Sequence, residues 1–255
     1  MRALIPMAGA GSRFEKAGYN TPKPLLPLLD KPMVVSATQA LPKADKYTFI
    51  VRDFQIKDYQ IDIHLKKYFP ESELIILDQL TEGQAVTCLK AKHIFDPNEE
   101  LLIGASDNGM LYDLNLFEKA KQAADVLVFT FRNNPAVDLN PSAYGWVKLK
   151  SNDLEIDKMS VKVPISNTPQ KDHAVVGAFW FRKSDHFTRS AEDMITKNTR
   201  INNEFYVDEC INNSIELGLK VHVFEIEHYV CWGTPADYES FKYWNGYYQK
   251  ITSNL

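Results

Sequence analysis

Cysteine is scarce in this sequence of 255 residues, and its three thiols, Cys88, Cys210 and Cys231, stand far apart. None of them forms the C-x-x-C spacing of zinc and redox sites, so the pattern indicates neither a zinc site nor a disulfide framework. The chain also lacks an apolar run approaching the roughly 20 residues that cross a bilayer. The apolar residues at the N-terminus stop at Gly9, too early for the hydrophobic region of a secretory leader. These absences predict a cytoplasmic protein with reduced thiols and no membrane partner.

Excess positive charge is missing as well. The chain has 29 Lys and Arg against 33 Asp and Glu, which gives a formal net charge of −4 and a pI near 5.9. Because nucleic acids attract strongly basic surfaces, this balance argues against a nucleic-acid partner. The hydrophobic fraction of 45% is ordinary for a globular protein with a sizeable core. No repeat, low-complexity tract or linker divides the chain, so we expect a single domain over residues 1–255.

The most informative stretch covers residues 2–33. It opens with a short apolar run that is typical of a buried strand. A small-residue turn follows at Gly9, Gly11 and Ser12, and Arg13 comes directly after it. Glycines let backbone N–H groups face inward, and such a concavity binds anions, usually phosphates. Lys23 stands between two prolines, whose rings restrict the backbone and so aim the ammonium. The stretch therefore predicts a phosphate-binding loop with two aimed cations.

Two common phosphate-binding motifs are absent from this stretch. The dinucleotide fingerprint needs a third glycine where Phe14 stands, and no GK[ST] follows for a P-loop. Instead, G-x-G-S-R-F followed by PKPL and DKPM resembles the signature of the nucleoside-triphosphate transferase family. Members of this family join NTPs to sugar phosphates and related acceptors. The resemblance implies that Ala8 and the three residues of the turn bind nucleotide, and that Arg13 and Lys23 act in catalysis.

Helical and strand patterns alternate over the next seventy residues. Residues 34–41 favour a helix, 47–52 a strand and 56–69 a helix, because apolar residues there recur every four positions. Residues 74–77 and 101–105 are apolar enough for buried strands. With the resemblance, this alternation predicts an α/β fold: a Rossmann-like mixed sheet of GT-A type, flanked by helices. The second half of the chain would add the strands that bind the acceptor.

Two turns in this region are candidates for binding nucleotide and metal. Gly83 and Gln84 open a helix, and the resemblance implies that they contact the base, although a plain helix cap would have the same sequence. Ser106 and Asp107 follow a strand, where open parallel sheets bind ligands. The resemblance implies that Ser106 binds nucleotide and that Asp107 is the first ligand of Mg²⁺, which prefers oxygen. The alternative for Asp107 is an Asx turn.

The second half carries the acceptor candidates. The resemblance implies that Gly145, in a strand at residues 144–149, lets the backbone approach the acceptor. Lys162 partly matches the Glu-Lys-x-Pro element whose lysine holds the acceptor phosphate, with Val161 in place of the glutamate. A solvent-exposed lysine is the alternative. Glu204 lies in a segment that resembles the family's Gly-Glu-Phe-Tyr element, which contacts the acceptor. Glu204 and Asp208 are not both assigned to this contact, and the alternative for either acid is a cap of the helix over residues 210–217. His173, in a polar loop over residues 166–173, is expected to make a polar contact or none, and not to act as a general base.

The last motif departs from the family pattern. Cys231 begins a segment that resembles Asp-x-Gly-Thr-Pro, whose aspartate is usually the second metal ligand. A thiol is a poor ligand for Mg²⁺, so Asp107 is predicted to be the main protein carboxylate on the metal. Thr234 and Pro235 suit the N-cap and first position of a terminal helix. Aromatic residues crowd that helix, which indicates a packing face or the interface of a homodimer.

The resemblance extends from residue 3 to about 243, with the motifs in the family's order. Its opening is most similar to a bacterial subgroup associated with capsule and surface polysaccharides. The prediction is a nucleotidyltransferase that joins an NMP to a phosphorylated acceptor, with CTP first among the NTPs and UTP or dTTP next. The acceptor would be a sugar 1-phosphate or a small phosphorylated alcohol, amine or amide.

A GT-A glycosyltransferase is one alternative, but it should carry Asp-x-Asp where Asn108 and Gly109 follow Asp107. A nucleotide-binding regulator that has lost catalysis is another.

Overall fold

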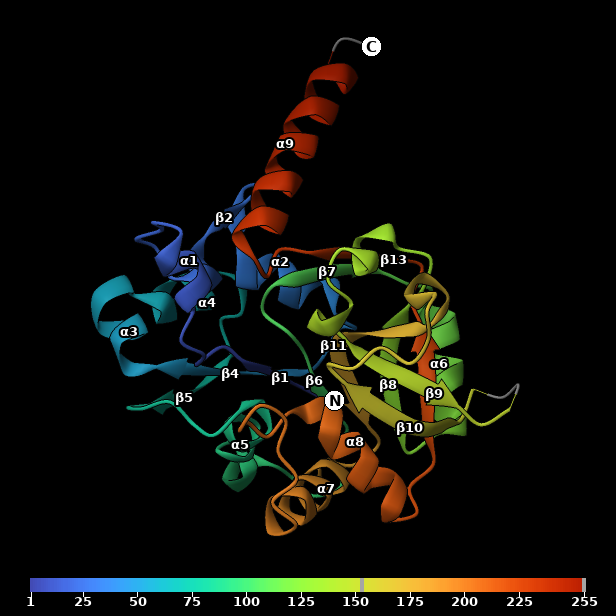
Figure 1. The fold of residues 1–255 in the computed structure, drawn as a ribbon. Helices are drawn as coiled ribbons and strands as arrows, with labels where there is room; N and C mark the ends of the chain where they lie inside the picture. Colours follow the sequence, from blue (N-terminus) through green and yellow to red (C-terminus); the bar gives the residue numbers. More distant parts are fainter. Residues whose placement is uncertain (152–153, 254–255) are drawn as a thin grey trace.

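A mixed sheet of nine strands organises the protein. The computed structural model describes residues 1–151 and 154–253, and the main strand order is β10-β9-β11-β6-β1-β4-β5 (Figure 1). Its parallel part consists of β1 (Arg2–Pro6), β4 (Lys46–Arg52), β5 (Glu73–Leu77) and β6 (Leu101–Ile103). These strands end at the same edge, where loops from distant parts of the sequence meet. The predicted α/β class is confirmed.

The second half of the chain extends the sheet with antiparallel pairings. Strand β11 (His173–Phe181) pairs with β6, with β8 (Val126–Phe131) and with β9 (Gly145–Leu149). Strand β10 (Ile156–Val161) pairs with β9, and β12 (Val221–Glu225) runs parallel to β8. Within β11 the register shifts at Gly177, whose φ of 89° is a left-handed conformation that favours glycine. This bulge lies beside Ala105 and Asn108, at the end of β6.

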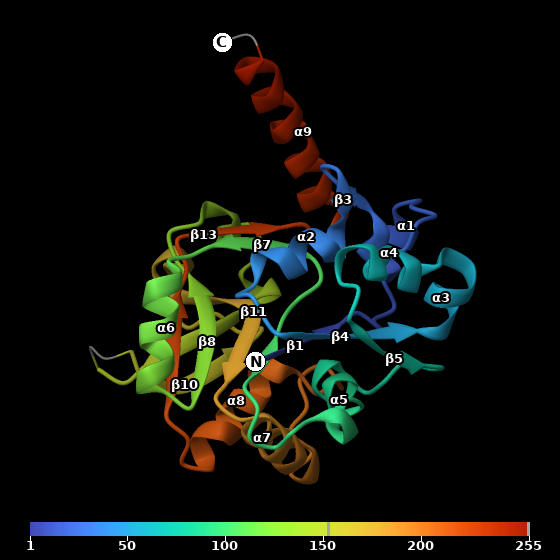
Figure 2. The same ribbon diagram turned by 180° about the vertical axis from the view of Figure 1, so that it is seen from behind.

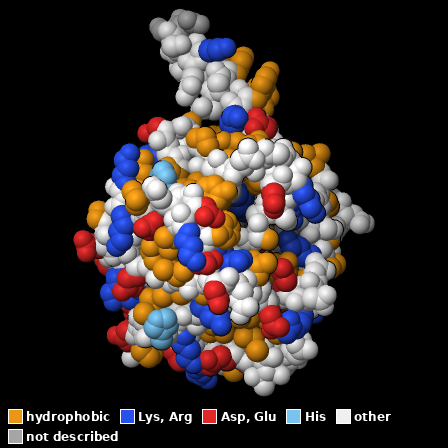
Figure 3. Space-filling model, turned by 90° about the vertical axis from the view of Figure 1, so that its left-hand side faces the viewer, with side chains coloured by type: hydrophobic (Ala, Val, Ile, Leu, Met, Phe, Trp, Pro, Cys, Tyr) orange, Lys and Arg blue, Asp and Glu red, His pale blue; other side chains and the backbone are white. Residues whose placement is uncertain are grey.

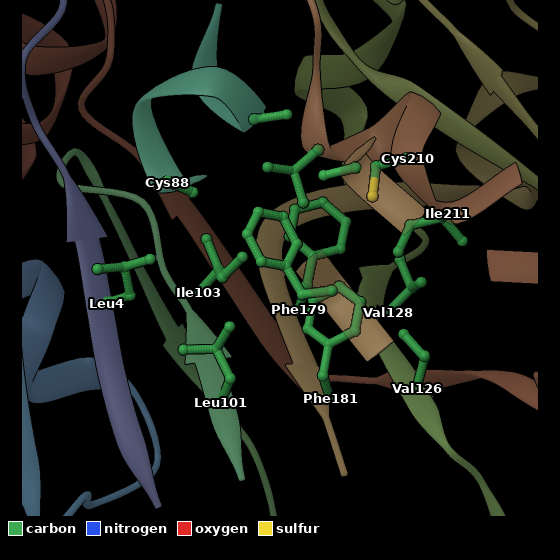
Figure 4. Packing of buried hydrophobic residues seen from close by; sticks show 14 of the residues in the cluster. Leu4, Cys88, Leu101, Ile103, Val126, Val128, Phe179, Phe181, Cys210 and Ile211 are labelled. Carbon is green, nitrogen blue, oxygen red and sulfur yellow. The ribbon is translucent and has the colours of Figure 1, made fainter. Parts of the chain in front are cut away.

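Helices cover both faces of the sheet (Figures 1 and 2). On one face, α5 (Gln84–Leu89), α7 (Ser184–Thr196) and α8 (Val207–Glu216) enclose an apolar cluster that includes Leu4 and Phe179 (Figure 4). On the other, α2 (Met33–Ala40), α4 (Ile61–Tyr68) and α6 (Leu114–Ala123) enclose a second cluster. Each fully buried large side chain contributes about 1.5–3 kcal/mol relative to exposure. The sheet is therefore a stable base for the loops at its edge. No helix of the described ranges is both long and apolar enough to cross a membrane.

Three local predictions are wrong. The pattern over residues 56–69 is two helices, α3 (Asp53–Tyr59) and α4, because Gln60 between them has a left-handed backbone with φ of 51°. Strand β5 forms, but it is not buried, since it lies at the edge of the sheet and leaves Ile76 56% exposed. His173 is also not in a loop: it opens β11, is buried and shares a hydrogen bond of 2.9 Å with Thr130. Of the two outcomes expected for this imidazole, a polar contact or none, the structure shows a polar contact.

A third apolar cluster attaches the terminal helix α9 (Pro235–Thr252) to the body. Tyr238 is buried there against Phe14 and donates a hydrogen bond of 2.6 Å to the Pro27 carbonyl. Pro27 belongs to the short hairpin of β2 (Pro27–Leu28) and β3 (Lys31–Pro32). The predicted cap is confirmed, because Thr234 accepts from the Asp237 amide and Pro235 is the first helical residue. Beyond its first turns α9 projects from the molecule (Figures 1 and 2).

Candidate active site

The glycine-containing turn follows β1 at the edge of the sheet. Gly11, with φ of 65°, is the left-handed residue that starts the five-residue helix α1 (Ser12–Lys16), and Phe14 anchors that helix in the third cluster. Ala8 is buried, whereas Gly9 is exposed between two hollows. One hollow, of about 480 Å³, extends to Gly11 and Lys23. The other, of about 270 Å³, is lined by residues from several loops: Ala8, Gly9, Leu80, Gly83, Gln84 and Glu204.

Lys23 and Asp107 form an ion pair, although 84 positions separate them in the sequence. The Lys23 ammonium donates to Asp107 Oδ2 at 2.7 Å, with side-chain exposures of 22% and 26%. Lys23 lies in a turn of 3-10 helix (Lys23–Leu25), which Pro22 precedes in an extended conformation. Asp107 lies just beyond β6, next to the buried Ser106. The structure thus brings the predicted cation and the predicted metal ligand into direct contact.

Cys231 reaches Asp107 through a two-stranded ribbon of β7 (Asn108–Leu111) and β13 (His228–Cys231). In this ribbon Cys231 lies opposite Asn108, and the next amide, of Trp232, donates to the Asp107 carbonyl at 2.9 Å. A Cβ on Gly233 would lie 2.9 Å from Asp107 Oδ2, so glycine permits this close approach. Burial first, and then the Asp107 charge, raise the pKa of the Cys231 thiol to about 12. The thiol is therefore neutral near pH 7.

The donor set at Asp107 suits a cation that obtains most of its ligands from a substrate. Within the described residues no three His, Cys, Asp or Glu side chains gather closely enough to hold a metal by themselves. Asp107 offers one hard carboxylate, and the neutral thiol of Cys231 is a soft ligand. Mg²⁺ is commonly held by one or two carboxylates together with phosphate oxygens and water. The residues present thus fit Mg²⁺ with Asp107 as its protein ligand.

A segment from the second half of the chain, Glu204 and Phe205, lies across the turn at Gly83 and is called the strap below. Phe205 donates to the Glu82 carbonyl at 2.8 Å and accepts from the Ala85 amide at 2.9 Å. A Cβ on Gly83, whose φ is 123°, would collide with the backbone of Phe205. The Ala85 amide, in the first turn of α5, is therefore bonded within the chain and is not free for a ligand. Glu204, next to Phe205, faces the same hollow as Gly83 and Gln84.

Lys162 follows β10 in a strained conformation. Its φ is 64°, which a residue with a side chain rarely adopts, and its amide donates to the Tyr144 carbonyl at 3.1 Å. The ammonium donates to the Ala143 carbonyl at 2.5 Å and lies 5.7 Å from the centre of the Tyr206 ring. Burial lowers the pKa of Lys162, and the nearby charges of Asp208 and Glu204 oppose that shift. The charge of the exposed Arg13 lowers this pKa as well.

Asp208 is the acid beside Lys162, and the residue patterns alone did not separate it from Glu204. It lies in the first turn of α8, where its carboxylate occupies the space that a Cβ on Gly145 would need. Gly145 therefore makes room for this carboxylate. Burial raises the pKa of Asp208 to about 6, with the Lys162 charge opposing the shift. The two acids thus lie in different places. Glu204 lines the hollow at Gly83, whereas Asp208 lies between Gly145 and Lys162.

Replacing Asp208 by asparagine is expected to stabilise the protein at pH 8 by roughly 2 kcal/mol. Because the folded-state pKa of Asp208 is raised, the folded protein holds the proton more tightly than the unfolded chain. The charged form therefore costs stability above about pH 6, and this cost disappears near pH 4. Urea unfolding of the wild type and Asp208→Asn at both pH values tests this. Asp157→Asn, an exposed acid on β10, is the control. An equal difference at both pH values would contradict the assignment.

Comparison with known proteins supports a common origin for these features. The sequence profile of the nucleotidyl transferase family matches residues 2–217. A search of curated protein sequences found no match. The fold is similar to a nucleoside-diphosphate-sugar pyrophosphorylase from Vibrio cholerae RC9, with a TM-score of 0.77 and 20% identity over 94% of this chain and 98% of that one.

Two other solved structures are also similar. The inositol-1-phosphate CTP transferase from T. maritima has a TM-score of 0.72 and 14% identity, covering 94% of this chain and 93% of that one. A UDP-glucose pyrophosphorylase complexed with UDP-glucose has a TM-score of 0.70 and 19% identity, covering 98% of both chains. At these identities the likeness establishes the fold alone.

Proposed function

This chain belongs to the nucleotidyl transferase family, and from that membership we propose that it transfers an NMP from an NTP to a phosphorylated acceptor, with release of pyrophosphate. The observation that carries the proposal is the contact between Lys23 and Asp107 at the edge of the sheet, beside the glycine turn. A cation and a carboxylate in contact, next to a loop of small residues, suit a triphosphate and its counter-ion.

The reaction needs no protein nucleophile. A phosphate oxygen of the acceptor attacks the α-phosphorus of the NTP in line, a new P–O bond forms, and the bond to the departing pyrophosphate breaks. The protein contributes position and charge. The exposed Arg13 would hold the outgoing phosphates, and Lys23 would leave Asp107 to contact the α-phosphate. Lys162 would bind the acceptor phosphate on the other side.

Asp107 would hold Mg²⁺ once Lys23 has turned toward the phosphates. The metal, when bound, supplies neutralisation of phosphate charge that the three cations leave uncancelled. Gly233 contributes by leaving space at Asp107 Oδ2. Ala8, Gly9 and the hollow at Gly83 and Gln84 would take the nucleoside part of the NTP.

The base and acceptor are further parts of the proposal. We assign CTP first and UTP or dTTP next, with a sugar 1-phosphate or a small phosphorylated alcohol, amine or amide as acceptor, for capsule or surface-polysaccharide precursors. The opening motif at residues 7–14 supports this assignment through its resemblance to that bacterial subgroup. The similar T. maritima protein, described as an inositol-1-phosphate CTP transferase, is consistent with CTP.

A matrix of NTPs against phosphorylated acceptors, with pyrophosphate as the product measured, tests the proposal. We expect release that depends on both substrates and on Mg²⁺, and is fastest with CTP. Binding of NTPs without release of pyrophosphate, whichever acceptor is added, would indicate a nucleotide-binding regulator instead. Release of a nucleoside diphosphate from a nucleotide sugar would indicate a glycosyltransferase.

Replacing Lys162 by methionine is expected to raise the KM for the acceptor by ten-fold or more, on the scale of one lost charge-assisted contact, and to change the KM for the NTP little. Methionine keeps the length of the side chain but removes the ammonium that lies over Tyr206. Lys158→Met, an exposed lysine on β10, is the matched control. Equal effects on both KM values, or none, would show that Lys162 does not bind the acceptor phosphate.

A further inference from the structure

The outer part of α9 carries a hydrophobic stripe that none of the described residues of its own chain covers. In the described structure the only buried residue of this helix is Tyr238, near its start. Five large side chains further along are between 39% and 69% exposed, namely Tyr243, Trp244, Tyr247, Tyr248 and Ile251. Residues three or four apart share one face of a helix, so these five form a single stripe. Figure 3 shows the helix standing out from the body, with hydrophobic side chains along one edge.

The stripe lies on an ordered helix whose start is anchored to the body of the protein. The root of α9 is fixed by Tyr238 in the third cluster and by Phe241, whose ring centre is 5.6 Å from that of Trp232. From Tyr243 onward the aromatic side chains contact one another, with ring centres 5.4–6.3 Å apart. Residues 243–249 contain no charge. An isolated helix of this length is marginal in water, so the exposed stripe needs a partner to stabilise it.

The hydrophobic stripe of one copy is complementary to the same stripe of a second copy. We infer that the protein forms a homodimer in which the α9 helices of two copies pack against each other, antiparallel, about a two-fold axis near Trp244. Aromatic side chains pack favourably on aromatic side chains. The five side chains expose about 500 Å² per copy, so two copies could bury up to about 1,000 Å² from them, which is near the lower limit for a specific interface.

Charge on the edge of α9 supports the antiparallel order. Glu239 and Lys250 are eleven positions, about three turns, apart, so they lie on the same edge of the helix. In an antiparallel pair the start of this edge faces the end of the same edge in the partner. Each Glu239 would then approach the Lys250 of the other copy, and the midpoint between the two positions falls at Trp244. The charges and the aromatic stripe thus agree on one register.

Tryptophan fluorescence gives a direct readout. The sequence has four tryptophans; Trp146, Trp180 and Trp232 are at most 5% exposed, whereas Trp244 is 51% exposed. Iodide should therefore quench Trp244 selectively. Sedimentation velocity from micromolar to submillimolar concentration is expected to show a change from one chain to two. Quenching of Trp244 should fall over the same concentration range as the partner covers the ring.

Variants locate the interface. Tyr247→Glu keeps the Trp244 reporter and is expected to weaken association by on the order of 100-fold, as for a central aromatic contact. Leu139→Glu, at a leucine 88% exposed elsewhere on the surface, is the control that should still dimerise. Lys250→Glu should weaken association, and adding Glu239→Lys should restore it. Far-UV circular dichroism and the melting temperature establish that each variant is folded.

Several results would overturn the inference. One is a single chain at every concentration with Trp244 quenched throughout. A second is Tyr247→Glu that associates as tightly as the wild type, because the interface would then lie elsewhere. A third is Lys250→Glu without effect, which excludes the antiparallel register. A shift of Trp244 emission only on adding phosphatidylcholine–phosphatidylglycerol vesicles, at the mass of one chain, would identify a lipid surface as the occupant instead.

Discussion

Lys23→Ala is expected to lower kcat by on the order of 100-fold, the scale of losing one preorganised charge donor in an active site. The ammonium is part-buried, is flanked by prolines and lies at the edge of the sheet beside the glycine turn. Its contribution should therefore appear mainly in the transition state, where charge develops on the attacked phosphate. Steady-state pyrophosphate release with saturating substrates measures the change. Lys31→Ala, which removes a nearby lysine bonded to Gln39, is the control.

The ion pair adds a second, opposite effect to the same variant. In the structure the Lys23 ammonium is bonded to Asp107 Oδ2. Removing the ammonium frees the carboxylate, so Mn²⁺ should bind the nucleotide-free variant about five-fold more tightly, as expected for a part-exposed pair worth up to about 1 kcal/mol. Electron paramagnetic resonance of free Mn²⁺ measures this directly. A folded variant with nearly normal turnover would show that Lys23 only partners Asp107.

Much of this architecture follows from local sequence. The parallel strands β1, β4 and β6 are short apolar runs between turns, and such runs have few alternatives once they alternate with helices. The start of α9 was predictable for a similar reason, because Thr234 and Pro235 satisfy rules that act within one turn. The prediction of a single helix over residues 56–69 is wrong because the helical spacing of apolar residues continues past Gln60. That spacing does not reveal that Gln60 has a left-handed backbone.

The assembly of the candidate site depends on pairings that no local pattern reveals. Asp107, Asn108 and Gly109 have the composition of a turn, yet Asn108 and Gly109 begin β7, whose partner β13 lies more than a hundred positions away. This pairing is what brings Cys231 to Asp107. Likewise, the sequence pattern does not decide whether Glu204 or Asp208 is the acid that contacts the acceptor. They separate because the strap at Phe205 bonds to Glu82 and Ala85, which turns Glu204 toward Gly83 and leaves Asp208 beside Lys162.

Asp107→Asn is expected to abolish detectable turnover at ordinary Mg²⁺, a loss of at least 10²–10³-fold, because it removes the one hard carboxylate predicted to hold the metal. The amide is isosteric, so the variant should fold normally. Activity against Mg²⁺ concentration separates a lost metal ligand from a lost partner of Lys23. Only the lost ligand raises the Mg²⁺ requirement.

Cys231 supplies the matched comparison on the other side of Asp107. Its neutral thiol accepts a hydrogen bond from the Gly233 amide at 3.3 Å, which a serine hydroxyl can also do, so Cys231→Ser should change kcat by less than about three-fold. Cys231→Asp should behave differently. A second carboxylate beside Asp107 should lower the melting temperature without metal through like-charge repulsion, and Mg²⁺ with nucleotide should reverse that loss. The same variant should then reach half-maximal activity at lower Mg²⁺, because two carboxylates bind the ion more tightly than one. An inactive Cys231→Ser together with an active Asp107→Asn would place the metal away from Asp107.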